Sequence, residues 1–311
     1  MATLRDVIRS THRILEAEDI PDPRLEAEVM VMSHMRMPRQ DIFSNQENEV
    51  SALQERELAV TVKRRLTREP LAYILGIREF YGINLLVNSE VLIPRPETES
   101  LVEHALFMAL MGMETTELAI ADVGTGTGAI AINLALHLPA ARIYAVDSSD
   151  SALDVAAYNI RTHNVADRVT LAKGDLLVPV PEPVDLIVAN LPYLPTARIP
   201  TLQPEIQWEP KLALDGGEDG LDAIRRLLSQ APSKVKEQAM DGLVNLHEFD
   251  LPGALVTQEI QRMRQQMMQQ FGGGQQFDAS ILPDDLFKEQ AERSVRLGLV
   301  VRAILDKHEI K

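Results

Sequence analysis

The chain has 311 residues with no Cys, and its 46 acidic against 31 basic residues give a formal net charge of −15. The length allows two or three domains, the missing Cys excludes disulfides and thiolate metal sites, and we predict no metal. The acidic balance argues against a nucleic-acid duplex as the main partner. No apolar run approaches the roughly 18 residues of a membrane span and the N-terminus lacks a signal peptide's apolar core, so we expect a cytoplasmic protein without membrane contact.

The first part of the chain predicts a helical domain over residues 1–76. Apolar residues recur there at helical spacing, and Pro21-Asp22-Pro23 separates the first two helices. Residues 79–94 contain short β-rich runs around Gly82 and Asn88-Ser89, which predict a hairpin or two short strands in a linker over 77–96.

From residue 97 the pattern alternates between helix and strand. Helices are expected at 97–111, 127–138 and 149–163, and strands at 118–123, 142–147, 168–175 and 184–190. Strands that alternate with helices predict an α/β fold with a parallel, doubly wound, Rossmann-like sheet over 97–232.

After Gly220 the strands stop and the remaining chain reads as helical. Gln and Met become frequent between 258 and 270, and residues 271–276 (FGGGQQ) separate the last two predicted helices. The composition therefore favours a separate all-helical segment over 233–311.

The stretch DVGTGTGAI follows a predicted strand and opens a predicted helix. Its glycines, Gly124, Gly126 and Gly128, allow a tight turn with backbone amides facing a ligand. Asp147 ends the next strand, where a carboxylate can accept both hydroxyls of a ribose. A solvated glycine turn is the alternative, but this spacing favours a nucleoside cofactor.

The spacing G-x-G-x-G, with Thr125 and Thr127 between the glycines, resembles motif I of S-adenosylmethionine-dependent methyltransferases. The resemblance implies that residues 124–128 and Asp147 bind S-adenosyl-L-methionine. It also implies that Asp175 and Leu176, which close the third strand, contact the adenine.

The fourth strand ends in the tetrapeptide Asn190-Leu191-Pro192-Tyr193, which by itself is an ordinary turn. It can also hold a planar NH₂ group by two acceptors, the Asn190 side-chain oxygen and the Leu191 carbonyl, while Tyr193 packs on the amide. Such orientation can lower a barrier by several kcal/mol. The geometry suits a glutamine amide or the exocyclic amine of adenine, with Asn190 also beside the methyl donor.

Further motifs make residues 1–230 resemble the release-factor glutamine N5-methyltransferases, the HemK family. They are EPLAYILG (69–76), EFYG (79–82), VLIPRPETE (91–99), DVGTGTGAIAI (122–132) and EPKLALDGGEDGLDAIRRLL (209–228). The resemblance implies methylation of the glutamine in the GGQ loop of peptide-chain release factors. It also implies that the helical domain helps to recognise the release factor and that residues 190–193 hold the glutamine.

One position departs from that family, which has Pro where this chain has Leu191. The change keeps the carbonyl, but it frees φ and adds an N–H. Asn-Leu-Pro-Tyr is also similar to the tetrapeptide of ribosomal-RNA adenine dimethyltransferases, so adenine N6-methylation of RNA or DNA remains the alternative activity.

A complete fold of this family has seven strands, and the sequence predicts only the first four. Residues 234–311 instead resemble part of the C-terminal chaperone domain of trigger factor, so the chain reads as a chimera. We expect an open sheet edge at the fourth strand and weak or absent methyl transfer. The other alternative is non-catalytic binding of unfolded polypeptide through apolar residues of the tail, among them Met263 and Leu297, which are otherwise the core of a helical bundle.

Overall fold

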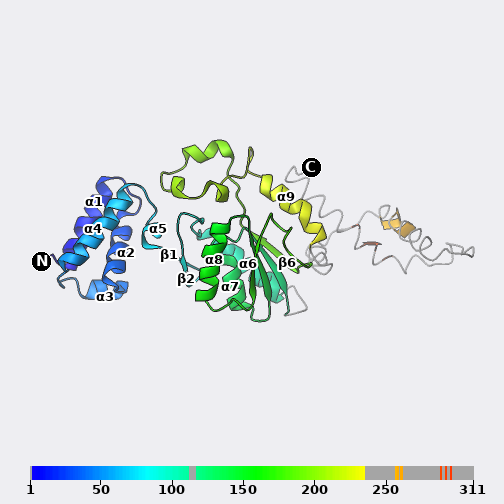
Figure 1. Ribbon diagram of the computed structural model, residues 1–311, viewed down its shortest axis with the longest axis horizontal. Helices are drawn as coiled ribbons and strands as arrows, with labels where there is room; N and C mark the ends of the chain where they lie inside the picture. The colour runs from blue at the N-terminus through cyan, green and yellow to red at the C-terminus, as the bar shows by residue number, and fades with distance from the viewer. Residues whose placement is uncertain are drawn as a thin grey trace, which may run out of the picture.

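The computed structural model describes residues 2–111 and 117–234, together with residues 256–258, 260, 261, 288, 291, 292 and 295. Figure 1 shows a group of helices at the blue end of the chain and, beside it, a core in which helices flank a sheet. The helix group and the sheet are joined by α5 and a small β-hairpin. These parts are taken below in chain order.

The N-terminal part is helical, as the apolar periodicity predicts. Its helices are α1 (Leu4–Ala17), α2 (Pro23–Met35), α3 (Arg39–Ser44), α4 (Ala52–Leu66) and α5 (Leu71–Leu75). Capping boxes fix the starts of α1 and α4, where Thr3 pairs with Asp6 and Ser51 with Gln54. Their apolar faces form one core around Leu15, in which Met30 and Ile42 are fully buried.

The linker contains one hairpin, formed by β1 (Ile77–Phe80) and β2 (Ile83–Leu86). Tyr81 and Gly82 form its turn with φ angles of 48° and 77°, the left-handed pair that a two-residue hairpin turn needs. The predicted hairpin is confirmed at Gly82. The apolar run 91–93 forms no strand, because Val91 and Ile93 pack against helix α8 instead.

The core alternates helix and strand as predicted. Its helices are α6 (Glu97–Met111), α7 (Ala129–His137), α8 (Asp150–Thr162) and α9 (Asp222–Gln230), and its strands are β3 (Ala119–Val123), β4 (Arg142–Asp147), β5 (Val169–Lys173) and β6 (Leu186–Ala189). Helix α6 and strand β4 have the predicted bounds, and the others differ by a few residues. All strand pairs in this sheet are parallel, in the order β5-β4-β3-β6, which confirms the α/β class.

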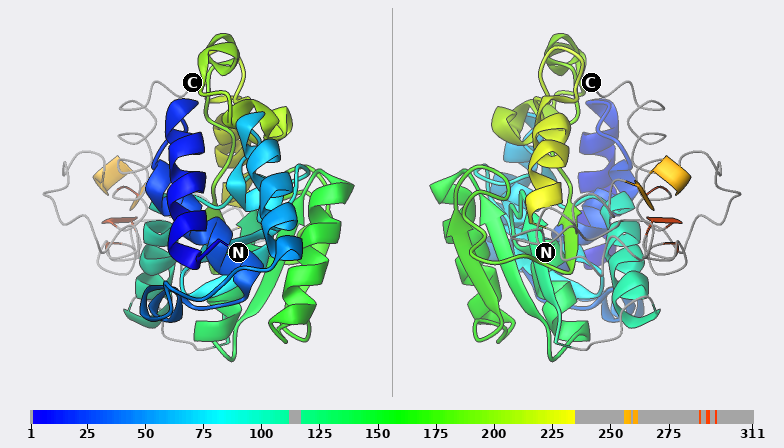
Figure 2. Two further views of the ribbon diagram at one scale, coloured as in Figure 1. Left: turned by 90° about the vertical axis from the view of Figure 1, so that its left-hand side faces the viewer. Right: turned by 90° about the vertical axis from the view of Figure 1, so that its right-hand side faces the viewer.

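The two faces of the sheet are covered unequally. Helices α6, α7 and α8 pack on one face, where Ile120, Ile143 and Val188 are buried with them. The other face meets α9 and the loop that follows β5, and Figure 2 shows α9 in yellow alone on that side among the described helices. Ile187 and Ala189 on this face remain partly exposed.

Within residues 2–111 and 117–234, strand β6 lies at the edge of the sheet, as the sequence predicts. Among residues 2–111 and 117–234, no strand pairs with its outer side. The last described residue of this range, Lys234, lies at the start of β6, where its carbonyl accepts a hydrogen bond of 2.7 Å from the Val184 amide.

Few residues of the tail are described. Those few are helical, and Ile260 and Ala291 are buried against each other with Val256 beside them. The other helices predicted after residue 234, and the apolar residues Met263 and Leu297, lie outside the described residues.

Candidate functional site

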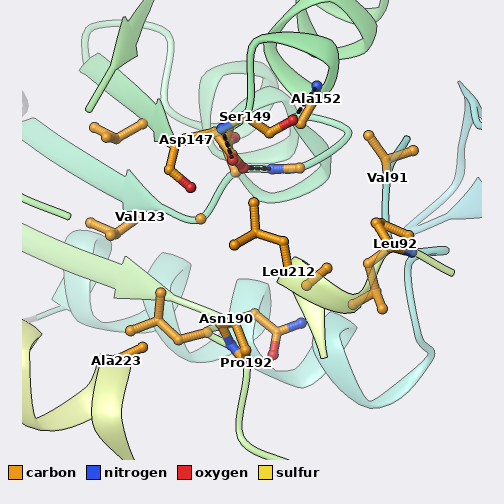
Figure 3. Close-up of a pocket in the computed structure, with 18 of the residues that line it drawn as sticks. Val91, Leu92, Val123, Asp147, Ser149, Ala152, Asn190, Pro192, Leu212 and Ala223 are labelled. Carbon is orange, nitrogen blue, oxygen red and sulfur yellow. Dashed lines mark hydrogen bonds between the residues drawn. The ribbon is translucent and has the colours of Figure 1, made fainter. Parts of the chain in front are cut away.

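A cavity of about 610 Å³ opens at the carboxyl ends of the strands, where the strand order reverses between β3 and β6. This is the position at which open α/β sheets bind ligands, and the volume is ordinary for a small-molecule site. Every predicted cofactor residue from Gly124 to Thr127, with Asp147, Asp175, Leu176 and Asn190, lines it. Figure 3 shows Asp147 and Asn190 on different sides of the space, with Leu212 between them.

The glycine loop turns sharply between β3 and α7. Its amides at Gly124 and Thr125 both donate to the Val146 carbonyl at 2.9 Å, which ties the loop to β4. Gly128 has a φ of 81°, so α7 begins at Ala129, two residues later than predicted. Gly128 itself does not line the cavity, because it packs against α8, where an added Cβ would lie 3.5 Å from Ala156.

Asp147 ends β4 and faces the glycine loop. Its Oδ2 accepts from the Gly126 amide at 2.9 Å, and its Oδ1 accepts from the Ser149 amide at 3.0 Å. Dashed lines beside Asp147 in Figure 3 mark these bonds. A carboxylate has about four acceptor positions, so two remain for hydroxyl donors of a ligand.

Asp175 and Leu176 follow β5 on the rim of the cavity. Asp175 is half exposed and forms an ion pair with Arg226 of α9. Leu176 is buried with a φ of 50°, a conformation that costs a residue with a side chain roughly 1–2 kcal/mol.

The tetrapeptide 190–193 lies where the first cavity meets a second one of about 340 Å³. Asn190 and Leu191 line both cavities, Pro192 only the first and Tyr193 only the second. The Asn190 side-chain NH₂ group donates to Thr98 Oγ1 at 3.2 Å. This bond does not use the Oδ1 of Asn190. Thr98 lies within the motif VLIPRPETE, in the part PRPETE, but the pattern alone assigns it no role.

The loop of the motif LALDGGEDGLD packs against the backbone of the tetrapeptide. Gly220 has a φ of 83°, and a Cβ placed there would lie 2.4 Å from the Tyr193 carbonyl oxygen. Because no side chain fits, the loop packs directly on the backbone of residue 193. Asp219, just before helix α9, accepts from the Leu221 amide and pairs with Arg225.

Two motifs that lie far apart in the sequence meet beside the second cavity. Glu209 is buried, pairs with Arg95 and accepts a hydrogen bond of 3.3 Å from the Ile93 amide. Burial raises the pKa of Glu209, although Arg95 opposes the shift. The pair thus joins the motif PRPETE to the motif EPKLAL. The two motifs lie far apart in the sequence, which does not reveal the contact.

Acidic side chains predominate around the first cavity. They are Glu90, Asp147, Asp175, Asp215 and Asp222, against Lys211 and Arg226. A cavity of this charge favours a cationic ligand. S-adenosylmethionine carries a sulfonium and an ammonium group, so the volume and the carboxylates of the cavity suit it.

Asp122 lies beneath the glycine loop and is fully buried. Its Oδ2 accepts from Thr125 Oγ1 at 2.6 Å and from the Ala131 amide at 3.1 Å, whereas its Oδ1 has no partner. Burial raises the pKa of Asp122 from 3.8 to about 6. The residue links the loop to the first turn of α7, and only the fold reveals this.

This pKa predicts a stability change with pH. Between pH 3.8 and about 6 the folded chain binds the proton more tightly than the unfolded chain, so the free energy of unfolding falls as pH rises through that window. The loss is at most about 3 kcal/mol, because each pKa unit corresponds to roughly 1.4 kcal/mol. Asp122→Asn is expected to remove it, and urea unfolding of both proteins from pH 4 to 7 measures it. Parallel pH profiles for the two proteins would contradict the prediction.

Within the described ranges, no group of His, Asp and Glu is arranged to hold a metal ion. None of the described helices is long and apolar enough to cross a membrane.

The sheet order, the glycine loop and the acidic residue at the end of β4 define a Rossmann-like methyltransferase core. Comparison with known proteins agrees. The chain is 44% identical over 230 residues to the release factor glutamine methyltransferase of Moorella thermoacetica, covering 74% of this chain and 80% of the relative. It therefore belongs to the release factor glutamine methyltransferase family.

Family models divide the chain similarly. The PrmC N-terminal domain model matches residues 6–76, and the ribosomal protein L11 methyltransferase (PrmA) model matches residues 104–205. A solved structure of the ribosomal protein L11 methylase from Lactobacillus delbrueckii subsp. bulgaricus aligns at 23% identity, with a TM-score of 0.34, over 52% of this chain and 67% of that one. This partial likeness adds nothing to the fold described above.

The C-terminal part matches a different protein. The model of the bacterial trigger factor C-terminus covers residues 225–311. Trigger factor of Alcanivorax borkumensis is 91% identical over 87 residues, 28% of this chain and 20% of that relative's length. The match reaches back into α9, so the chain joins parts of two proteins, as its sequence predicts.

Proposed function

We propose that this chain methylates the side-chain nitrogen of the glutamine in the Gly-Gly-Gln motif of peptide-chain release factors, using S-adenosyl-L-methionine. The observation that carries the proposal is the meeting of two cavities at Asn190 and Leu191. One cavity suits the methyl donor, and the other opens on the acceptor side of the same residues. Family membership supports the choice of acceptor.

When bound, the donor supplies an electrophilic methyl group on its sulfonium. The residues of the chain bind and orient: the carboxylate of Asp147 and the backbone of the glycine loop, which lines the first cavity, hold the nucleoside end. The Asn190 Oδ1 and the Leu191 carbonyl accept the two N–H groups of the glutamine amide, which turns its nitrogen toward the methyl carbon. Transfer forms the nitrogen–carbon bond, breaks the carbon–sulfur bond and leaves a proton for water.

The proposal is tested with labelled methyl donor and three acceptors in parallel: a release factor, its Gly-Gly-Gln→Gly-Gly-Ala variant, and ribosomal RNA. Label on the first alone is the expected result. Label on RNA would favour the adenine-specific alternative. A reaction without added acceptor is a necessary control, because residues 273–275 of this chain also read Gly-Gly-Gln. No label on any acceptor would mean that the open sheet edge leaves the site inactive.

We expect the hydroxyl of Thr98 to orient the side chain of Asn190. Because Thr98 Oγ1 accepts from the Asn190 amide, Thr98→Val should free that side chain to rotate and lower kcat roughly five- to tenfold, the effect of one neutral hydrogen bond. Thr98→Ser keeps the hydroxyl and should retain most of the activity. Steady-state methylation measures kcat, and calorimetry should give donor affinities within twofold of each other for all three proteins. Equal activity of the Val and Ser variants would contradict the assigned role.

The trigger factor-like segment supports a second candidate function, the binding of unfolded polypeptide. The supporting observation is the 91% identity, although the matching part is only a fifth of that relative. The full chain should slow the aggregation of a chemically unfolded client, and an equal concentration of serum albumin is the control. No difference between the two would exclude this function.

A further inference from the structure

The segment between β6 and α9 (residues 194–216) forms the outer wall of the second cavity. It contributes Leu194, Leu202, Ile206, Ala213 and Leu214 to that wall. Figure 1 shows it in yellow-green on the upper side of the molecule, above the sheet and toward the helical domain. Its described structure consists of three short 3₁₀ turns, so its position depends on side-chain anchors.

Its first anchor closes the segment on itself, and its second joins it to the methyltransferase core. At its base, Leu194 and Asp215 form an isolated bridge, in which the Leu194 amide donates to the Leu214 carbonyl at 3.1 Å. Further along, Glu209 pairs with Arg95. The turn Thr196–Thr201 is tied to the base through Thr196, whose amide donates to the Gly217 carbonyl at 2.9 Å. The turn Ile206–Trp208 adjoins Glu209, whose amide donates to the Ile206 carbonyl at 3.1 Å.

The third anchor comes from the helical domain. Glu205 Oε1 accepts from Arg65 at 3.1 Å and from Arg68 at 3.2 Å, across about 140 positions of sequence. The Arg65 side chain is 2% exposed and is itself held by both oxygens of Glu26, at 2.7 and 3.1 Å. Arg68 also donates to the Glu18 carbonyl at 2.8 Å. Contacts other than Glu205 therefore hold both arginines in place.

The electrostatics of the cluster favour a charged Glu205. Burial alone would raise its pKa, but hydrogen bonds from its own backbone, Arg65 and Arg68 outweigh burial and lower it. Without Glu205, the Nη1 of the buried Arg65 would lose its carboxylate acceptor, and an unsatisfied buried donor is costly. The pairing therefore fixes where residue 205 can lie.

Glu205 stands beside residues that form the cavity. Ile206 follows it directly, Leu202 precedes it by three positions, and both line the second cavity. We propose that Glu205 is a positioning residue for the methyl acceptor: Arg65 and Arg68 hold it, and the helical domain thereby sets the outer wall of the acceptor cavity. This inference rests on the proposed function, because it assigns the second cavity to the acceptor.

The chain contains a reporter for this wall. Trp208 is its only tryptophan, lies in the same turn as Ile206 and is 42% exposed. Its amide donates to the Glu205 carbonyl at 3.2 Å. Fluorescence quenching of the full chain by acrylamide therefore reports the position of the wall without requiring any turnover.

The test compares Glu205→Gln and Arg68→Met with Glu69→Gln in the full chain. Glu69 pairs with Arg64 near the same end of α4, outside the 194–216 segment, so its substitution matches the lost charge. Arg68 is 30% exposed, and its substitution leaves the buried Arg65–Glu26 pair intact should Glu205→Gln unfold. Thermal unfolding identifies any variant that does not fold.

We expect the quenching constant to be at least twofold larger than that of the original chain in Glu205→Gln and Arg68→Met. In Glu69→Gln it should be unchanged. The KM for the release factor should rise about tenfold in the first two, with kcat and donor affinity within twofold of the original chain. Unchanged Trp208 quenching in both variants would overturn the positioning role, as would an equal rise of KM in Glu69→Gln. An original chain that methylates no release factor would contradict the proposed function, whereas the Trp208 comparison would still decide the positioning of the wall.

Discussion

Asn190→Ala is expected to lower kcat for methylation of the glutamine acceptor about 10²–10³-fold. The substitution removes the side-chain oxygen that orients the acceptor amide, and a lost orienting contact of this kind usually costs a factor of that order. Calorimetric titration should show donor affinity within about threefold of the original chain, because the nucleoside end is held by the glycine loop and Asp147.

Asn190→Asp is the matched variant. It keeps the size and one oxygen, but it cannot donate to Thr98 and it places a charge between the two cavities. Activity should therefore fall in this variant too. Retention of more than about a tenth of the activity by Asn190→Ala, with the fold intact, would exclude the assigned role.

Asp147→Ala is expected to weaken binding of S-adenosylmethionine about 100-fold. The carboxylate holds the amides of Gly126 and Ser149, and we assign it the ribose hydroxyls as well. Hydrogen bonds to a charged group contribute roughly 1.5–3 kcal/mol each, and about 3 kcal/mol corresponds to a factor near 100. Isothermal calorimetry on the full chain measures the change.

Asp150→Ala provides the control for this substitution. Asp150 lies three residues further on, is 72% exposed and forms only a surface ion pair with Lys173. Its loss removes the same charge without touching the cavity lining, so affinity should change less than twofold. Similar losses in both variants would mean that general charge, rather than the contacts of Asp147, governs binding.

Local patterns in the sequence predict the elements of the core well. Helix α6 starts after two prolines and β4 ends at Asp147, and both have the predicted bounds. Where α7 starts two residues late, the cause is the left-handed conformation of Gly128, which the spacing of glycines does not reveal. The apolar run 91–93 lies within the β-rich stretch 79–94, but tertiary packing against α8 determines its conformation.

The candidate site divides in the same way. The glycine loop and the tetrapeptide 190–193 can be predicted, because each is a short motif at the end of a strand. The contacts that hold them cannot, because they join distant positions: Thr98 with Asn190, Arg95 with Glu209, and Arg65 with Glu205. The motifs PRPETE and EPKLAL point to important residues without saying that they meet.

The shortness of β6 limits accidental pairing with strands of other molecules. β6 spans only Leu186–Ala189, and in the described part of the chain its outer side has no partner strand. About half of its backbone groups point outward, so a foreign strand would gain roughly two to four hydrogen bonds, or about 2–4 kcal/mol. Micromolar association needs about 8 kcal/mol, and short edge strands are one of the ways in which proteins avoid aggregation. An accidental partner on this side of β6 would therefore dissociate readily.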